Sequence, residues 1–404
     1  MKRTPLFYPI FAAVIIAIGG CSRCGSKSSG DSARQTTPGK AIAIPVTRAA
    51  YVTNNGSDTL SVIDRDGDTV DTVPIDLEPD AREAPHHLAI DSATKTVFVA
   101  LAFPPELSPD KKKKKDPHAS HGNAEDVGRL ARLDLGTLAV KETREVDENP
   151  GDVVLTHDKK RVLVTHYDMK RAMTVAAKGG GSPATMFASV IVFDAASMKK
   201  LGARPVCVAP HGIAVTKDDK TAFVACYGSD ELAVVDLSSD GFGIARHPLG
   251  AAQGVPGVPG YGPYSATLSP DESLVVVADL EGQDLRVFDR ADKRFMEKTI
   301  PLSSKAFMPA FVDARTLIVP MQAPDGIARV DIDLFKVDKR ATFPKDVCGQ
   351  PHAVKQAKDG RVYLVCEGNH TAPGSVLEID PATLAMKKRW QVGVYPDGIA
   401  FGDE

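Results

Sequence analysis

Residues 50–64 read AYVTNNGSDTLSVID: two short apolar runs flank a polar turn, and the second run ends on an aspartate. Short runs of β-branched and aromatic residues between turn signals are typical of strands. Related units recur along the chain, with a proline before the first strand and an aspartate closing the third. Such self-similarity indicates a repeat architecture built from small sheets. The prolines are Pro85, Pro150, Pro210, Pro263, Pro309, Pro351 and Pro396, and the aspartates are Asp64, Asp134, Asp194, Asp236, Asp289, Asp331 and Asp380.

The two ends of the repeat region complement each other. The last unit has only its first strand, residues 396–401, whereas the first unit starts at its second strand, residues 50–54. One sheet completed by both ends leaves no open edge. We therefore predict an all-β fold over residues 48–404, a seven-bladed β-propeller of four-stranded antiparallel blades, closed three strands plus one. The rival interpretations are a nonspecific all-β array or two sandwiches. The seven aspartates are expected to be structural, each accepting backbone N–H groups of the following turn.

Three segments carry a resemblance to a known family. Residues 51–64, which begin YVTN, resemble the signature unit of the YVTN-repeat β-propellers, and residues 210–215 (PHGIAV) and 396–399 (PDGI) resemble its first strand. The resemblance covers residues 48–404 and implies the propeller fold. Relatives include lactonases, the N-terminal propeller of nitrous-oxide reductase and propellers of unknown role, so it implies no single activity.

The N-terminus has the features of an export signal. Residues 1–20 combine a basic start with a short apolar run, and small residues directly precede Cys21, as in a bacterial lipobox. We predict that Cys21 is lipidated and that residues 21–47 form a flexible tether. The protein would then be anchored through lipid in the bacterial cell envelope, facing the periplasm or in the outer membrane. The alternatives are an uncleaved anchor or an ordinary signal peptide. Cys24 has no assigned role.

Composition excludes several functions. Acidic residues outnumber basic ones by 52 to 49, a formal charge of −3, which argues against a nucleic-acid partner. The chain has no phosphate-binding glycine loop, no nucleophile elbow and no haem-attachment motif. No cofactor is therefore expected from motifs alone.

The long insertions predict which face of the ring is functional. Residues 102–128, 166–188 and 250–262 all fall between second and third strands or between blades, on one face. Loops on a rigid scaffold are the usual place for binding and catalysis. The alternative is that loop lengths vary freely and that the long ones fall on one face by chance. Lys111–Lys115, in the first insertion, would contact lipid phosphates or an acidic partner, or simply be solvated.

Polar residues after the repeat prolines are expected to meet at the mouth of the channel on that face. Imidazoles converging there would bind copper or zinc, through His86, His211 and His352. The resemblance to the nitrous-oxide reductase propeller, which holds copper with histidines, implies the same. The alternative is a polar funnel without metal. His166 is added because it ends the second strand of its blade on the same face. The channel-mouth candidates are His86, His87, Asp152, His166, His211, Tyr264, His352 and Asp397.

Four cysteines occupy matching positions in two repeats. Cys207 and Cys348 lie three residues before a repeat proline, and Cys226 and Cys366 lie three residues after an aromatic residue of the second strand. In an oxidising compartment we expect the disulfides Cys207–Cys226 and Cys348–Cys366. The alternative is that these thiolates bind a metal together with the nearby histidines.

These observations favour a lipid-anchored binding module over an enzyme. Its ligand, an unidentified protein or small molecule, would bind the loop-rich face at the central channel. The alternative is a copper-dependent redox propeller or a lactonase-like hydrolase that uses the channel-mouth histidines and aspartates.

Overall fold

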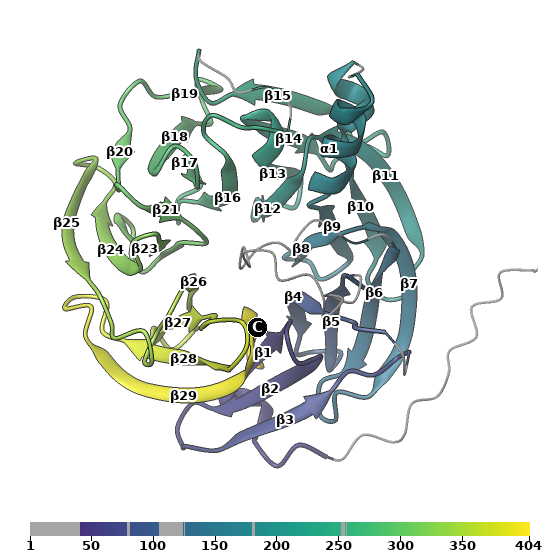
Figure 1. Ribbon diagram of the computed structural model, residues 1–404. Helices are drawn as coiled ribbons and strands as arrows, with labels where there is room; N and C mark the ends of the chain where they lie inside the picture. The colour runs from purple at the N-terminus through teal and green to yellow at the C-terminus, as the bar shows by residue number, and fades with distance from the viewer. Residues whose placement is uncertain are drawn as a thin grey trace, which may run out of the picture. The chain divides into compact units, whose positions relative to one another are not determined.

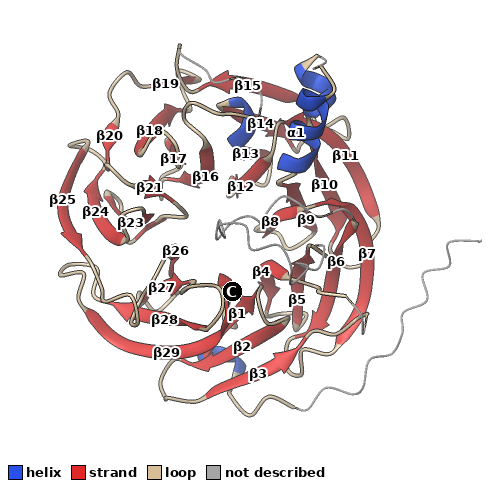
Figure 2. Ribbon diagram, viewed as in Figure 1, coloured by secondary structure: helices blue, strands red, loops and turns tan. Residues whose placement is uncertain are grey.

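The computed structural model describes residues 41–78, 81–104, 124, 126–179, 182–251, 255 and 257–404. Cys21, Cys24 and Lys111–Lys115 lie outside this part of the chain. From residue 41 on, the described residues form seven antiparallel sheets set around a common axis, which confirms the seven-bladed propeller (Figure 1). Strands make up most of the ring (Figure 2).

Each blade begins at the axis with its innermost strand, after which we name it. Two blades depart from the regular pattern, because the inner strand of one and the outer strand of another are broken into two short pieces. The innermost strands are β4 (Pro85–Asp91), β8 (Pro150–Leu155), β12 (Pro210–Val215), β16 (Pro263–Leu268), β21 (Lys305–Ala306) with β22 (Ala310–Phe311), β26 (Pro351–Gln356) and β30 (Pro396–Phe401).

The second, third and fourth strands of each blade follow outward from the axis. The second strands are β1 (Ala49–Asn54), β5 (Thr96–Leu101), β9 (Arg161–His166), β13 (Thr221–Cys226), β17 (Leu274–Asp279), β23 (Thr316–Gln322) and β27 (Val362–Cys366). The third strands are β2 (Thr59–Asp64), β6 (Val127–Asp134), β10 (Ala188–Asp194), β14 (Glu231–Asp236), β18 (Asp284–Asp289), β24 (Gly326–Asp331) and β28 (Pro373–Ile379). The outer strands are β3 (Val70–Pro74), β7 (Val140–Glu148), β11 (Lys200–Cys207), β15 (Ile244–Pro248), β19 (Arg294–Phe295) with β20 (Ile300–Pro301), β25 (Lys336–Ala341) and β29 (Met386–Val394).

The first and last strands of the propeller share one sheet. β30 pairs antiparallel with β1, and Ile399 lies opposite Val52 in the register. The Thr53 hydroxyl accepts a hydrogen bond from the Gly398 N–H at 2.9 Å. The blade named for β30 therefore contains both ends of the repeat region, and neither β1 nor β30 presents an open edge along this pairing.

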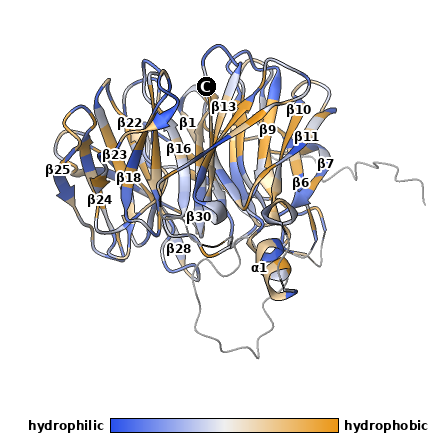
Figure 3. Cartoon of the chain, turned by 90° about the horizontal axis from the view of Figure 1, so that it is seen from above, coloured by the Kyte–Doolittle hydropathy of each residue, from blue (hydrophilic) through white to orange (hydrophobic). Residues whose placement is uncertain are grey.

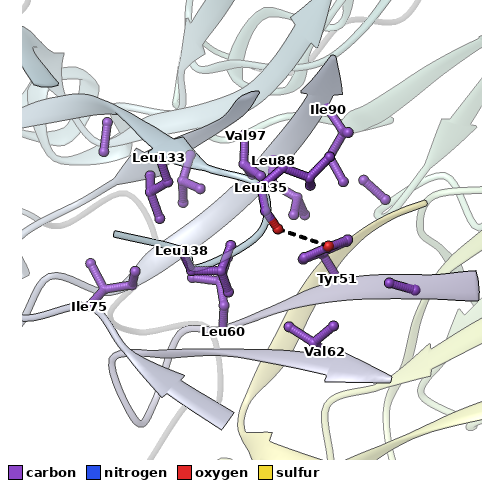
Figure 4. Close-up of a cluster of buried hydrophobic side chains, with 14 of the residues drawn as sticks. Tyr51, Leu60, Val62, Ile75, Leu88, Ile90, Val97, Leu133, Leu135 and Leu138 are labelled. Atoms are coloured by element: carbon purple, nitrogen blue, oxygen red, sulfur yellow. Dashed lines mark hydrogen bonds between the residues drawn. The ribbon is translucent and has the colours of Figure 1, made fainter. Parts of the chain in front are cut away.

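Apolar contacts between neighbouring blades hold the ring together. In the cluster of Figure 4, Tyr51 and Leu60 of one blade pack against Leu88 and Val97 of the next, and all four are buried. The Tyr51 hydroxyl donates to the Leu135 carbonyl at 3.0 Å, so its polar group is satisfied inside the core. Figure 3 shows the apolar residues concentrated in strands such as β9 and β10 rather than in turns.

The column of aspartates is structural, as predicted. Each carboxylate accepts a backbone N–H from the turn that follows its strand. The donors are the N–H groups of Asp66, Gly136, Ser197, Ser238, Ala291, Leu334 and Ala382, bonded to Asp64, Asp134, Asp194, Asp236, Asp289, Asp331 and Asp380 respectively.

The face opposite the aspartate turns carries the described part of the insertion at 166–188. It contains α1 (Met169–Ala177), capped by the Asp168 side chain, and the short helix η2 (Pro183–Met186). Two further 3-10 turns, η1 (Val46–Arg48) and η3 (Tyr227–Ser229), complete the helical elements of the described residues. Figure 3 shows α1 beyond one rim of the blades. Among the described residues, no helix has the length and apolar character needed to cross a membrane.

Both predicted disulfides are present. Cys207 bonds to Cys226 and Cys348 to Cys366, with Cα–Cα distances of 5.8 Å and 5.1 Å. The first joins the end of β11, the outer strand of the preceding blade, to the end of β13, and the second joins the link before β26 to the end of β27. The pairing argues against these four cysteines as thiolate ligands for a metal.

Candidate functional site

The innermost strands bring four histidines and one aspartate together at the axis. We call this group the central cluster: His86, His87, His211, His352 and Asp397. All five side chains are buried, although they come from four different blades. The ring centroids of His86 and His87 lie 4.3 Å apart, and those of His87 and His352 lie 6.3 Å apart. His211 lies 5.5 Å from His86 and 5.6 Å from His87.

A repeated backbone corner aims these residues at the axis. The residue before the proline has a positive φ in the cluster-bearing blades, for example 45° at Ala84 and 50° at Gln350. A register shift then follows the proline, as between Pro85 and Leu88. Successive side chains of a regular strand point to opposite faces, and a β-bulge breaks that alternation. His86 and His87, although adjacent in sequence, therefore both contact the cluster.

Asp397 is the common partner of three imidazoles. Its Oδ2 contacts His86 Nδ1, whereas its Oδ1 lies 3.0 Å from His352 Nε2 and 3.7 Å from His87 Nε2. The Asp397 side chain is 0% exposed, so these contacts take place away from bulk water. The two oxygens thus face different histidines.

Two further buried carboxylates surround the cluster. Glu367 contacts His352 Nδ1 and also lies 2.6 Å from His370 Nε2. Asp152 lies 3.4 Å from His87 Nδ1 and accepts the N–H groups of Val153 and Ile213. Sequence reasoning missed Glu367. The sequence gives one indication of it, because Glu367 is a polar residue directly after Cys366. The register places Cys366, the last residue of β27, opposite Pro351.

The carboxylates and burial set the charge of the imidazoles. Although burial alone lowers it, Glu367 and Asp397 raise the pKa of His352 to about 10. Burial, together with the neighbouring His86, holds the pKa of His87 well below its usual range. Burial raises the pKa of Asp152 to about 6. Although burial opposes it, contact with His86 and His352 keeps the pKa of Asp397 well below normal. The cluster therefore combines a neutral imidazole with an ionised carboxylate.

Aromatic rings enclose the cluster. Tyr264 stacks on His211 with 3.9 Å between centroids, and Tyr167 lies edge-on to His211 at 5.2 Å. The ring centroid of Phe307, from the β21–β22 blade, lies 5.3 Å from that of His352. These rings reduce the polarity around the imidazoles and strengthen electrostatic interactions within the group.

His166 lies apart from the central cluster. It is fully buried at the end of β9, and its Nδ1 lies 2.9 Å from the Ser189 carbonyl oxygen and 3.1 Å from the Ser189 hydroxyl. Ser189 in turn donates to Asp147 at 2.5 Å. His166 was expected at the channel mouth because it ends a second strand. The structure instead turns its ring toward the third strand of its own blade.

The donor set fits a metal ion. Two groups of three, His86–His87–His211 and His87–His352–Asp397, each place one ligand atom per residue within 4.8 Å of the others. Tetrahedral bonds of about 2.0–2.1 Å set ligand atoms roughly 3.3 Å apart. The 3.0 Å and 3.7 Å contacts of Asp397 with His352 and His87 bracket that value. Imidazole and carboxylate are ligands that zinc and copper accept.

The pKa of His352 gives a pH test of this geometry with no ion bound. Below its ordinary pKa of 6.5, His352 is protonated in both the folded and the unfolded chain. Between 6.5 and about 10 only the folded chain keeps the proton, so stability is expected to fall as the pH rises through this window. Thermal melting in a chelator from pH 6.5 to 9.5 measures the fall. The decline should be shallower in His352→Gln, and equal slopes in both proteins would contradict this account.

Comparison with known proteins identifies the fold but no family. Neither the protein-family models nor the curated proteins contain a match to this chain. The periplasmic gluconolactonase PpgL of Pseudomonas aeruginosa is similar in structure, with 17% identity, a TM-score of 0.60, and coverage of 87% of this chain and 98% of that one. A functionally unknown protein from Desulfotomaculum acetoxidans shares 13% identity with a TM-score of 0.61, over 88% of this chain and 98% of that one. The dihydro-heme d1 dehydrogenase NirN shares 14% identity with a TM-score of 0.54, over 90% of this chain and 76% of that one. At these identities the likeness extends to the fold alone.

Proposed function

We propose that this propeller is a binding module whose ligand at the central channel is a divalent transition-metal ion. The observation that carries the proposal is the buried convergence of His87, His352 and Asp397, with His86 and His211 beside them. Imidazole nitrogens, that of His352 after loss of its proton, and a carboxylate oxygen at these separations are a donor set for zinc or copper.

The charge of the cluster supports a cation. Asp152, Glu367 and Asp397 are three buried carboxylates, with exposed fractions of 7%, 0% and 0%. In the described part of the chain, the ion pairs of Asp397 are all with imidazoles, of which protonated His352 supplies one positive charge. Uncompensated buried charge is costly, and it is retained in proteins mainly when paired or bound to metal. A divalent ion would add positive charge beside these three carboxylates.

The surrounding residues would orient the ligands. Glu367 contacts Nδ1 of His352 and leaves Nε2 directed at Asp397. A carboxylate behind a histidine is the usual means of fixing a metal ligand. Tyr264 and Phe307 would exclude water from the two rings that they contact. When bound, the metal would supply Lewis acidity or a redox centre.

The cellular setting that we propose is the cell envelope. The two disulfides support an oxidising, extracytoplasmic compartment. Lipidation of Cys21 would attach the protein to a membrane. The loop-rich face of the ring would then meet an unidentified partner or small molecule of that compartment, and a nucleic-acid partner is not expected.

A lactonase-like hydrolase is the second candidate. The pair formed by His87 Nδ1 and Asp152 Oδ1 at 3.4 Å favours it, because a histidine oriented by a carboxylate can act as a general base. The likeness to a periplasmic gluconolactonase adds a reason to assay this activity. Hydrolysis of glucono-lactone that is lost in His87→Gln but unaffected by chelator would favour this candidate over the metal proposal.

Metal analysis of the full chain tests the proposal. Protein dialysed against zinc or copper and then passed over a desalting column is expected to retain at least one equivalent. His352→Gln should retain less metal than the wild type, whereas His166→Gln, which alters a buried histidine outside the cluster, should retain as much. Metal-free wild-type protein after this treatment would overturn the proposal.

A further inference from the structure

The central cluster contains more donors than one ion needs. Its two groups of three, His86–His87–His211 and His87–His352–Asp397, share His87 and lie side by side. A zinc ion commonly takes four ligands, and a site with three protein ligands completes them with water. Four buried imidazoles and a carboxylate therefore exceed the requirement of a single tetrahedral ion.

Asp397 connects the two groups through different oxygens. Oδ1 faces His352 Nε2 and His87 Nε2, whereas Oδ2 faces His86 Nδ1. The contact lengths of Oδ1 are 3.0 Å and 3.7 Å, so the oxygen is placed with these nitrogens as a third ligand would be. A carboxylate that presents one oxygen to each of two donor sets has the arrangement of a bridge.

We infer that the central cluster holds two metal ions side by side, bridged by the carboxylate of Asp397. One ion would lie at His87, His352 and Oδ1 of Asp397, and the other would lie at His86 and His211, with Oδ2 of Asp397 facing His86. This inference rests on the proposed function and extends it from one ion to two. Paired ions in proteins commonly lie about 3.5–4 Å apart, a spacing that one carboxylate spans.

The buried carboxylates around the cluster make it more suitable for two cations than a neutral polar pocket would be. Three carboxylates, those of Asp152, Glu367 and Asp397, lie within or against the cluster and are buried. Their combined negative charge offsets most of the four positive charges of two divalent ions.

Stoichiometry and spin coupling test the inference on the full chain. Copper(II) is added to metal-free protein, excess is removed, and copper per chain is measured by elemental analysis. The expected result is two equivalents. Double integration of the electron paramagnetic resonance spectrum should give clearly fewer than two spins, because a carboxylate bridge couples the two ions.

Two variants distinguish the two proposed ion positions. His211→Gln and His352→Gln should each retain one copper with a full single-spin signal, since each removes a ligand from a different ion. The control His166→Gln should retain two coupled ions. Circular dichroism spectra identical to wild type would establish that the variants are folded, and the wild-type measurement does not depend on them.

The outcomes distinguish the inference from the proposal beneath it. One copper per chain in wild type, lost in His352→Gln, would overturn the two-ion inference and leave the proposed function standing. If two coppers with a full two-spin signal persist in both variants, the copper ions are bound outside the central cluster. That result would overturn the inference. No bound copper would overturn both.

Discussion

Replacement of Asp397 by Asn is expected to weaken zinc binding at least about 100-fold. The substitution keeps the size of the side chain but removes the carboxylate that contacts His86, His87 and His352. An amide presents only one oxygen and no charge, so it can neither bridge nor neutralise a cation. Competition with a chromophoric chelator measures the affinity.

Two controls make this result specific to the cluster. His166→Gln alters a fully buried histidine that contacts Ser189 instead of Asp397, and it should leave the affinity unchanged. Circular dichroism would establish that Asp397→Asn is folded. Equal affinities in Asp397→Asn and wild type would show that the carboxylate takes no part in binding.

Ending the chain at Tyr395 is expected to abolish folding. The deletion removes β30, which completes the blade of β1, and it exposes a strand edge inside the ring. It also removes Ile399 and Phe401, buried at 5% and 0% exposure, each contributing about 1.5–3 kcal/mol through burial. The lost strand hydrogen bonds add to this cost. Far-ultraviolet circular dichroism and thermal melting measure the effect.

A matched change at the same end of the chain should be harmless. Glu404→Gln removes a partly exposed ion pair with Lys355 at 3.0 Å and should change the free energy of unfolding by less than about 1 kcal/mol. A truncated protein that is soluble and melts cooperatively would show that the ring does not depend on β30.

Much of the fold could be predicted because it rests on local signals. The prolines and aspartates recur once per blade, and strand-forming runs lie between them. The disulfides could be predicted for the same reason, since Cys207 and Cys348 occupy equivalent positions in two repeats. Residue type and spacing are sufficient to predict those features whose packing is repeated in every blade.

The details of the site depend on backbone geometry that spacing does not reveal. The register shift after Pro85 lets both His86 and His87 contact the cluster. Glu367 becomes a neighbour of His352 only because β27 ends where β26 begins. His166, at a similar position in its own blade, turns toward Ser189. Whether a rim residue faces the axis is thus decided by side-chain direction and pairing, which a single sequence does not specify.

The β21–β22 blade also departs from the repeat. Its inner strand is split into two residue pairs, each paired with β23, and Phe307 between them faces His352. Repeat position alone pointed to Ala310, the residue after Pro309, so the aromatic contact could not be predicted. Tyr264 of the neighbouring blade was expected at the channel, and it stacks on His211.

The most direct test of the central claim is anomalous diffraction from crystals of the full chain loaded with zinc. The account predicts strong anomalous density at the ring axis, bonded to His87, His352 and Asp397. An axis without anomalous density, in crystals whose zinc is bound only at surface residues, would contradict it.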